Sequence, residues 1–212
     1  MTRAKSALSL SLLGGAMVLA LVCCIGTSRP ARFYTLEPLQ VPDGSGATST
    51  HATLAVGPID LPDYVARPQI VTRTGSNELV ISEFDRWGGT LDDQIAGSLV
   101  AVLQDRLAPR QIAVIPWSSS MRSGDTVYAL AVGISRFDGV LGQSVVLKAR
   151  WELRVRSNGK EELLGVKEAS VTEPVTGQDY GALVAAMQRA LVRYGQQVGD
   201  GIAAVEPIPR AR

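Results

Sequence analysis

Cysteine and histidine are scarce in this chain of 212 residues, and their scarcity excludes several kinds of chemistry. The two cysteines, Cys23 and Cys24, are adjacent, so the chain has no disulfide framework. The one histidine, His51, lies in a stretch rich in Gly, Ser and Thr, without a rigid scaffold to orient it. We therefore expect no zinc or other metal site and no cofactor, and the composition argues against Ser-His-Asp or Cys-His catalysis.

An excess of charge of one sign is also missing. The 21 basic residues nearly balance the 20 acidic ones, which gives a formal net charge of +1. This balance provides no electrostatic footprint for nucleic acid, so we expect no nucleic-acid partner. In contrast, 46% of the residues are hydrophobic, which is enough to build a globular core. The length fits one domain with an appendage.

Sequence motifs for nucleotide binding and for hydrolysis are absent. Asn158-Gly159-Lys160 is followed by Glu161, so it is a turn and not a phosphate-binding loop. Gly142-Gln143-Ser144 lacks the second glycine of a nucleophile elbow. We assign no catalytic residue and expect that the protein is not an enzyme. A hydrolase that uses scattered carboxylates remains the alternative.

The first segment has the design of a secretion signal. Arg3 and Lys5 precede an apolar stretch over residues 7–22. That stretch is short and interrupted by glycine, whereas a permanent membrane span needs about 20 apolar residues. An uncleaved N-terminal anchor is the alternative interpretation.

The end of this segment, Leu21-Val22-Cys23-Cys24, resembles a bacterial lipobox, in which a small residue precedes an acylated cysteine. We place lipidation at Cys24, because modification of Cys23 would put the bulky Val22 in the preceding position. The register at Cys23 stays the alternative. By the same resemblance, Ile25 is not the aspartate typical of inner-membrane retention. We therefore expect acyl chains in the outer membrane and a domain that faces the periplasm.

These features divide the chain into four segments: a signal peptide (1–23), a short membrane tether (24–31), a domain (32–205) and a tail (206–212). Seven residues separate Cys24 from Arg32. At about 3.4 Å per residue they span at most roughly 25 Å. The domain is therefore expected to stay close to its membrane.

Hydrophobic periodicity within the domain predicts an α/β fold: a single compact domain with a mixed β-sheet and two principal helices. One helix begins after Thr90 and ends near Pro109, and the other begins after Asp179. The run 126–134 is apolar on both faces, which is typical of an interior strand of a sheet that is covered on two sides. Further strands are expected at 32–36, 54–59, 69–73, 78–82, 111–116, 144–156 and 161–172. The turn residues 74–77 between two of these runs predict a hairpin.

Two groups of residues are candidate partner contacts. Trp87 with Arg86 has the composition of an interface anchor, although a tryptophan that covers the core would look the same. Lys148, Arg150 and Arg154 lie on the polar side of the alternating strand 144–156. They could face anionic groups or an acidic partner. The alternative is the solvated face of an antiparallel strand.

Ordered blocks along the domain, at 32–36, 56–64, 67–73, 83–87 and 91–92, resemble the ABC-type transport auxiliary lipoproteins. The resemblance implies a lipoprotein that works with an MCE-domain protein and an inner-membrane transport component. Such systems are thought to carry lipids or other hydrophobic molecules between the two membranes of the envelope. The lipoprotein would dock the MCE assembly at the outer membrane. Because MCE assemblies are ring-like, a homo-oligomer is expected by symmetry matching. An independent lipid carrier is a further alternative.

Overall fold

The computed structural model describes residues 29–36, 52–118, 127–157 and 160–205. The chain divides into two units, Met1–Pro30 and Ala31–Arg212, and the second is described here by itself. The expected signal peptide, Cys24, His51 and the tail lie outside the described residues.

Five strands form the larger sheet, in the order β5-β2-β6-β7-β8. Strand β2 is parallel to both β5 and β6, while β6, β7 and β8 run antiparallel as two long hairpins. The turn expected at Asn158–Gly159 falls outside the described residues, but Ser157 pairs with Lys160 on either side of it. The strands span β2 Ala52–Asp60, β5 Ile112–Pro116, β6 Val127–Gly139, β7 Ser144–Ser157 and β8 Lys160–Pro174.

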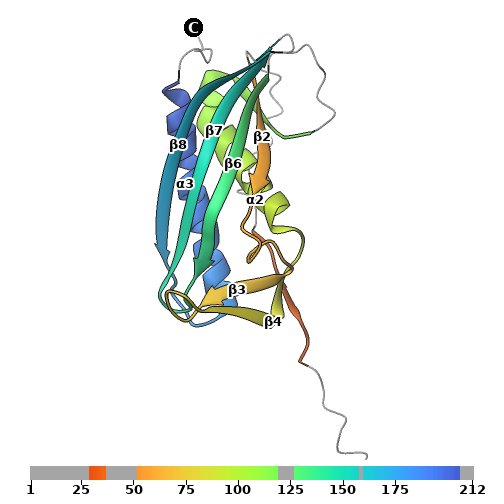
Figure 1. Ribbon diagram of the computed structural model, residues 1–212, viewed down its shortest axis with the longest axis vertical. Helices are drawn as coiled ribbons and strands as arrows, with labels where there is room; N and C mark the ends of the chain where they lie inside the picture. The colour runs from red at the N-terminus through yellow and green to blue at the C-terminus, as the bar shows by residue number, and fades with distance from the viewer. Residues whose placement is uncertain (1–28, 37–51, 119–126, 158–159, 206–212) are drawn as a thin grey trace, which may run out of the picture. The chain divides into compact units, whose positions relative to one another are not determined.

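Two helices, α2 (Leu91–Leu107) and α3 (Tyr180–Ala203), pack on one face of this sheet. Figure 1 shows both behind the long strands. As predicted, Asp179 caps α3 by accepting a hydrogen bond from the amide of Ala182 at 2.8 Å. Thr90 precedes α2, but its hydroxyl donates to the Asp93 carboxylate at 2.7 Å and does not cap an amide.

The opposite face of the larger sheet is open, which corrects the expectation for residues 126–134. Along β6 the side chains alternate between buried and partly or fully exposed, and the open side carries Ala129, Ala131, Gly133 and Ser135. Alanine and glycine count as apolar in the sequence pattern, so the pattern predicts a strand that is covered on both faces. Only the side toward α2 and α3 lies in the core, where Leu130 and Val132 are at most 1% exposed.

Three further strands form a smaller mixed sheet at one end of the long strands (Figure 1). These are β1 (Arg32–Tyr34), β3 (Gln69–Arg73) and β4 (Leu79–Trp87), in the order β1-β4-β3. The hairpin predicted at 69–82 is confirmed as β3–β4. The α/β class with two principal helices is also confirmed. The strands belong to two mixed sheets, because β1 is parallel to β4 and joins the hairpin, not the larger sheet.

Candidate functional site

An open, mainly apolar pocket of about 670 Å³ lies where the smaller sheet meets the start of α2. Trp87 at the end of β4 lines it and is only 4% exposed, whereas Phe33 on β1 is 66% exposed. The volume is within the range of about 300–1,000 Å³ that is common for ligand sites. Other apolar lining residues are Ile59, Leu61, Ala66, Pro68 and Leu91.

Few charges line this pocket. Asp60 and Asp92 lie along it, and Arg67 is the cation among its lining residues. The Nε atom of Arg67 is buried, and no hydrogen-bond partner is found for it among the described residues. The pocket can therefore accept an apolar group and offers one guanidinium for a polar end.

Asp85, which is 5% exposed, holds β1 against β4 beside the pocket. Its Oδ1 accepts hydrogen bonds from Arg32 Nε at 2.9 Å and from the Tyr34 hydroxyl at 3.0 Å. Its Oδ2 accepts one from the Ser82 hydroxyl at 2.9 Å. Burial, followed by the bond to this carboxylate, raises the pKa of Tyr34. The first strand of the domain is thus fixed by charge-assisted bonds.

A second buried carboxylate joins the two sheets. Asp138, near the end of β6, is fully buried and accepts hydrogen bonds from the Nε atoms of Arg73 at 2.8 Å and Arg136 at 2.9 Å. The Tyr64 hydroxyl donates to its other oxygen at 2.6 Å. Burial and this bond raise the pKa of Tyr64. Because Arg73 belongs to β3, the cluster attaches the smaller sheet to the larger one.

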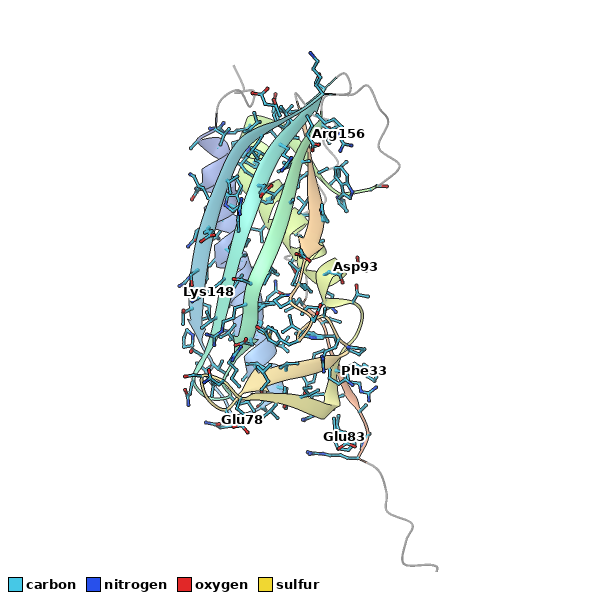
Figure 2. The ribbon with its side chains drawn as sticks, in the orientation of Figure 1. Phe33, Glu78, Glu83, Asp93, Lys148 and Arg156 are labelled. Carbon is cyan, nitrogen blue, oxygen red and sulfur yellow. The ribbon has the colours of Figure 1, made fainter. Side chains whose placement is uncertain are left out.

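The predicted contact residues fall in two separate places. Trp87 lines the pocket, and Arg86 is partly exposed next to it on β4. Lys148, Arg150 and Arg154 lie on the open face of the larger sheet, where Figure 2 labels Lys148. The structure therefore does not bring the two groups together.

Glu152 pairs with two of the basic side chains on that open face. Its carboxylate lies 3.0 Å from Arg150 Nη2 and 2.9 Å from Arg154 Nη2. The bond from Arg154 and the charge of Arg150 lower the pKa of Glu152. Opposite charges also face each other between strands, as at Arg150 and Glu168. This arrangement favours the interpretation of Lys148, Arg150 and Arg154 as part of the solvated face of an antiparallel strand.

No sequence pattern marks Phe33, Arg67 or Asp138 as a site residue. Phe33 and Arg67 fall within the blocks that carry the family resemblance, but nothing in their local pattern marks them as pocket residues. Asp138 follows an apolar strand and would pass for a strand-end carboxylate. Its partner Arg73 is 65 residues away in sequence, and only the fold brings the two together.

No metal-binding group of three or more His, Cys, Asp or Glu is found among the residues that the structure describes. Within the same residues, no helix has both the length and the hydropathy required to cross a bilayer.

Comparisons with known proteins agree on one family. Residues 34–199 match the family described as "ABC-type transport auxiliary lipoprotein component". The "Intermembrane transport lipoprotein PqiC" of Escherichia coli is 30% identical over 121 residues, and so is the protein of that name from Shigella flexneri. The aligned region covers 57% of this chain and 62% of each relative, which is less than two thirds of their length.

Solved structures share the fold. A crystal structure titled as an uncharacterized protein matches 82% of this chain and 99% of its own, with a TM-score of 0.66 and 21% identity. A protein from Xanthomonas campestris matches 81% of this chain and 94% of its own, with a TM-score of 0.60 and 20% identity. The family match spans most of the chain and nearly the whole folded domain. This chain therefore belongs to the family of ABC-type transport auxiliary lipoproteins.

Proposed function

We propose that this protein is an accessory component of an envelope-spanning ABC/MCE-type system that moves lipids or other hydrophobic molecules between the inner and outer membranes. Acyl chains on Cys24 anchor it in the outer membrane, and its domain faces the periplasm. Family membership supports the transport role, and the relatives named PqiC are intermembrane transport lipoproteins. The signal design at residues 1–22 supports the lipid anchor.

The pocket beside Trp87 is the observation that carries a docking role. An apolar hollow next to a buried tryptophan is where a partner can insert an apolar side chain, and such sites dominate binding energy. We assign it to contact with the MCE-domain protein, with Arg86 and Arg67 as polar contacts at its edge. The inner-membrane component would be reached through that protein. A homo-oligomer would match the symmetry of an MCE ring.

Affinity purification from crosslinked envelopes, followed by mass spectrometry, tests this proposal. The wild-type protein should carry an acylated N-terminal peptide that starts at Cys24, and it should recover an MCE-domain protein with its membrane partner. An acylated bait that recovers neither would overturn the docking role. An N-terminal peptide without acyl groups would overturn the anchor.

A matched pair of variants locates the contact. Ala66 lines the pocket and Ala185 lies on α3, and both are exposed. Ala66→Trp fills the pocket mouth and should reduce recovery of the MCE-domain protein by about tenfold or more, which corresponds to about 1.4 kcal/mol. Ala185→Trp should leave recovery unchanged. Equal recovery with both variants would place the docking contact elsewhere.

The size of the pocket also favours a second candidate, an independent lipid carrier. A volume of about 670 Å³ with an apolar lining suits a hydrophobic ligand. Purified protein would then retain lipid that organic extraction and mass spectrometry detect, and Ala66→Trp would displace it while Ala185→Trp would not. Docking alone predicts that neither variant changes the amount of retained lipid.

A further inference from the structure

Exposed large apolar side chains are unevenly distributed over the domain. Seven occur among the described residues, and four of them lie on the smaller sheet although it has far fewer residues than the larger one. These four are Phe33 (66% exposed) on β1 and Leu79, Val80 and Ile81 (37–49% exposed) on β4. Because Phe33 also lines the pocket assigned to the MCE-domain protein, we call the three residues on β4 the apolar tip. Such grouped exposure marks an interaction surface.

The charges around the apolar tip nearly cancel. Glu78 and Glu83 are exposed on the acidic side, while Arg32 and Arg86 supply positive charge on β1 and β4. Figure 2 shows Glu78, Glu83 and Phe33 at the same end of the domain, opposite Arg156. The Glu78 carboxylate also accepts a hydrogen bond from the Thr74 hydroxyl within the hairpin turn. Because Arg32 is paired with Asp85, the surface has no excess positive charge to attract an anionic partner, and it offers an apolar contact.

The chain enters the domain through this same sheet. Strand β1 begins at Arg32, and seven residues separate it from Cys24, so the reach from the anchored cysteine to β1 is about 25 Å. Strand β4 pairs with β1 at Asp85–Trp87, and Ile81 is four residues from this pairing. At about 3.3 Å per residue, the distance along β4 from Ile81 to this paired segment is shorter than the reach of the tether. The apolar tip can therefore reach the membrane surface that holds the anchor.

We propose that the apolar tip inserts into the headgroup region of the phospholipid layer that holds the acyl chains. This inference rests on the lipid anchor at Cys24 assigned above. The anchor alone would let the domain rotate about a single attachment, whereas a second, apolar contact fixes its orientation. The lipid surface that fits is zwitterionic, because the charges around the tip give no positive excess that would attract anionic headgroups.

Spin labels on the full-length acylated protein in phosphatidylcholine vesicles test the proposal. Val80→Cys places a label on the apolar tip, and Leu163→Cys places one on an exposed apolar residue of β8. Acylation occupies Cys24, so each label is unique after signal cleavage. At Val80 we expect high collision with oxygen and at least a threefold lower collision with a water-soluble nickel complex than at Leu163. Adding anionic lipid should change neither value.

Other outcomes separate the two proposals. If the mass confirms acylation but both labels are equally open to nickel, the tip does not touch the membrane and the inference fails alone. If the label at Val80 is protected from nickel and its spectrum is broadened by the label on a second copy of the chain, the tip contacts that copy. This outcome also overturns membrane insertion. If the mass shows no acyl groups, the anchor itself fails.

A substitution adds an independent check. Ile81→Asp in the Val80→Cys protein should raise nickel collision at the label to the level seen at Leu163, because a charged side chain disfavours insertion at the boundary of headgroups and acyl chains. Val166→Asp, at an exposed apolar position on β8, should not. Unchanged circular dichroism shows that both variants fold. No change with Ile81→Asp would overturn membrane insertion.

Discussion

The two sheets depend to different degrees on buried apolar contacts and on buried charges. The larger sheet buries the inner face of its central strands against α2 and α3, with Leu130, Leu147 and Leu153 fully enclosed. The smaller sheet shares this core through Ile70 and Trp87, but its connections also depend on two buried carboxylates, Asp85 and Asp138. It also carries most of the exposed large apolar residues that the structure describes.

This difference shows how a small sheet can present apolar side chains to the outside. Charge-assisted hydrogen bonds fix its strands, so that fewer of its apolar residues are required in the core. The larger sheet can leave its outer face to paired charges such as Arg150 and Glu152, because the helices supply its stability. We therefore expect the binding surfaces on the smaller sheet, and we expect the larger sheet to contribute most of the free energy of unfolding.

The largest effect should come from removing Asp138. Asp138→Ala leaves Arg73 and Arg136 without their carboxylate and should lower the free energy of unfolding by about 3–5 kcal/mol. Chemical denaturation measures the loss. Native-state hydrogen exchange should show β3 and β4 amides opening before those of α3. Asp200→Ala removes an exposed partner of Arg106 and should cost at most about 1 kcal/mol. Equal losses for both variants would mean that the buried cluster does not join the sheets.

Truncation of a core side chain between the larger sheet and its helices should lower the free energy of unfolding by a comparable or somewhat smaller amount. The pattern of hydrogen exchange should differ. Leu103 on α2 is fully buried, and Leu103→Ala should cost about 2–5 kcal/mol through lost burial and a cavity. Hydrogen exchange should accelerate in α2, α3 and the larger sheet together. Faster exchange confined to β3 and β4 would contradict the division of roles between the two sheets.

The smallest effect concerns alkaline pH. Burial and the bond to Asp138 raise the pKa of Tyr64 above its ordinary value of 10.0, so the folded state holds the phenolic proton more tightly than the unfolded state. Its contribution is complete below pH 10.0 and is lost as the pH rises through the higher folded value. Stability measured across this range should fall less steeply in Tyr64→Phe. Tyr180→Phe serves as the control, because the Asp138 carboxylate is bonded to Tyr64, Arg73 and Arg136 and not to Tyr180. Identical slopes for wild type and Tyr64→Phe would contradict the prediction.

Local patterns in the sequence predicted most of the elements, because each depends on neighbours along the chain. The alternation in 144–156 became β7, and the apolar spacing of Ile95, Leu99 and Val102 became the buried face of α2. The Thr74–Asn77 turn gave the β3–β4 hairpin. For residues 126–134 the pattern predicts two covered faces, whereas one face of β6 is open. Alanine and glycine are compatible with either burial or exposure, so the pattern does not distinguish the two.

The sequence by itself determined the α/β class, the two principal helices, the scarcity of catalytic groups and the blocks that mark the family. Tertiary structure alone decided which contacts form between distant residues. The pairing of β1 with β4, the clusters around Asp85 and Asp138, and the pocket beside Trp87 each join segments separated by tens of residues. Periodicity reports only which side of an element is apolar, whereas a site depends on which elements meet, and that is fixed by the packing of the whole chain.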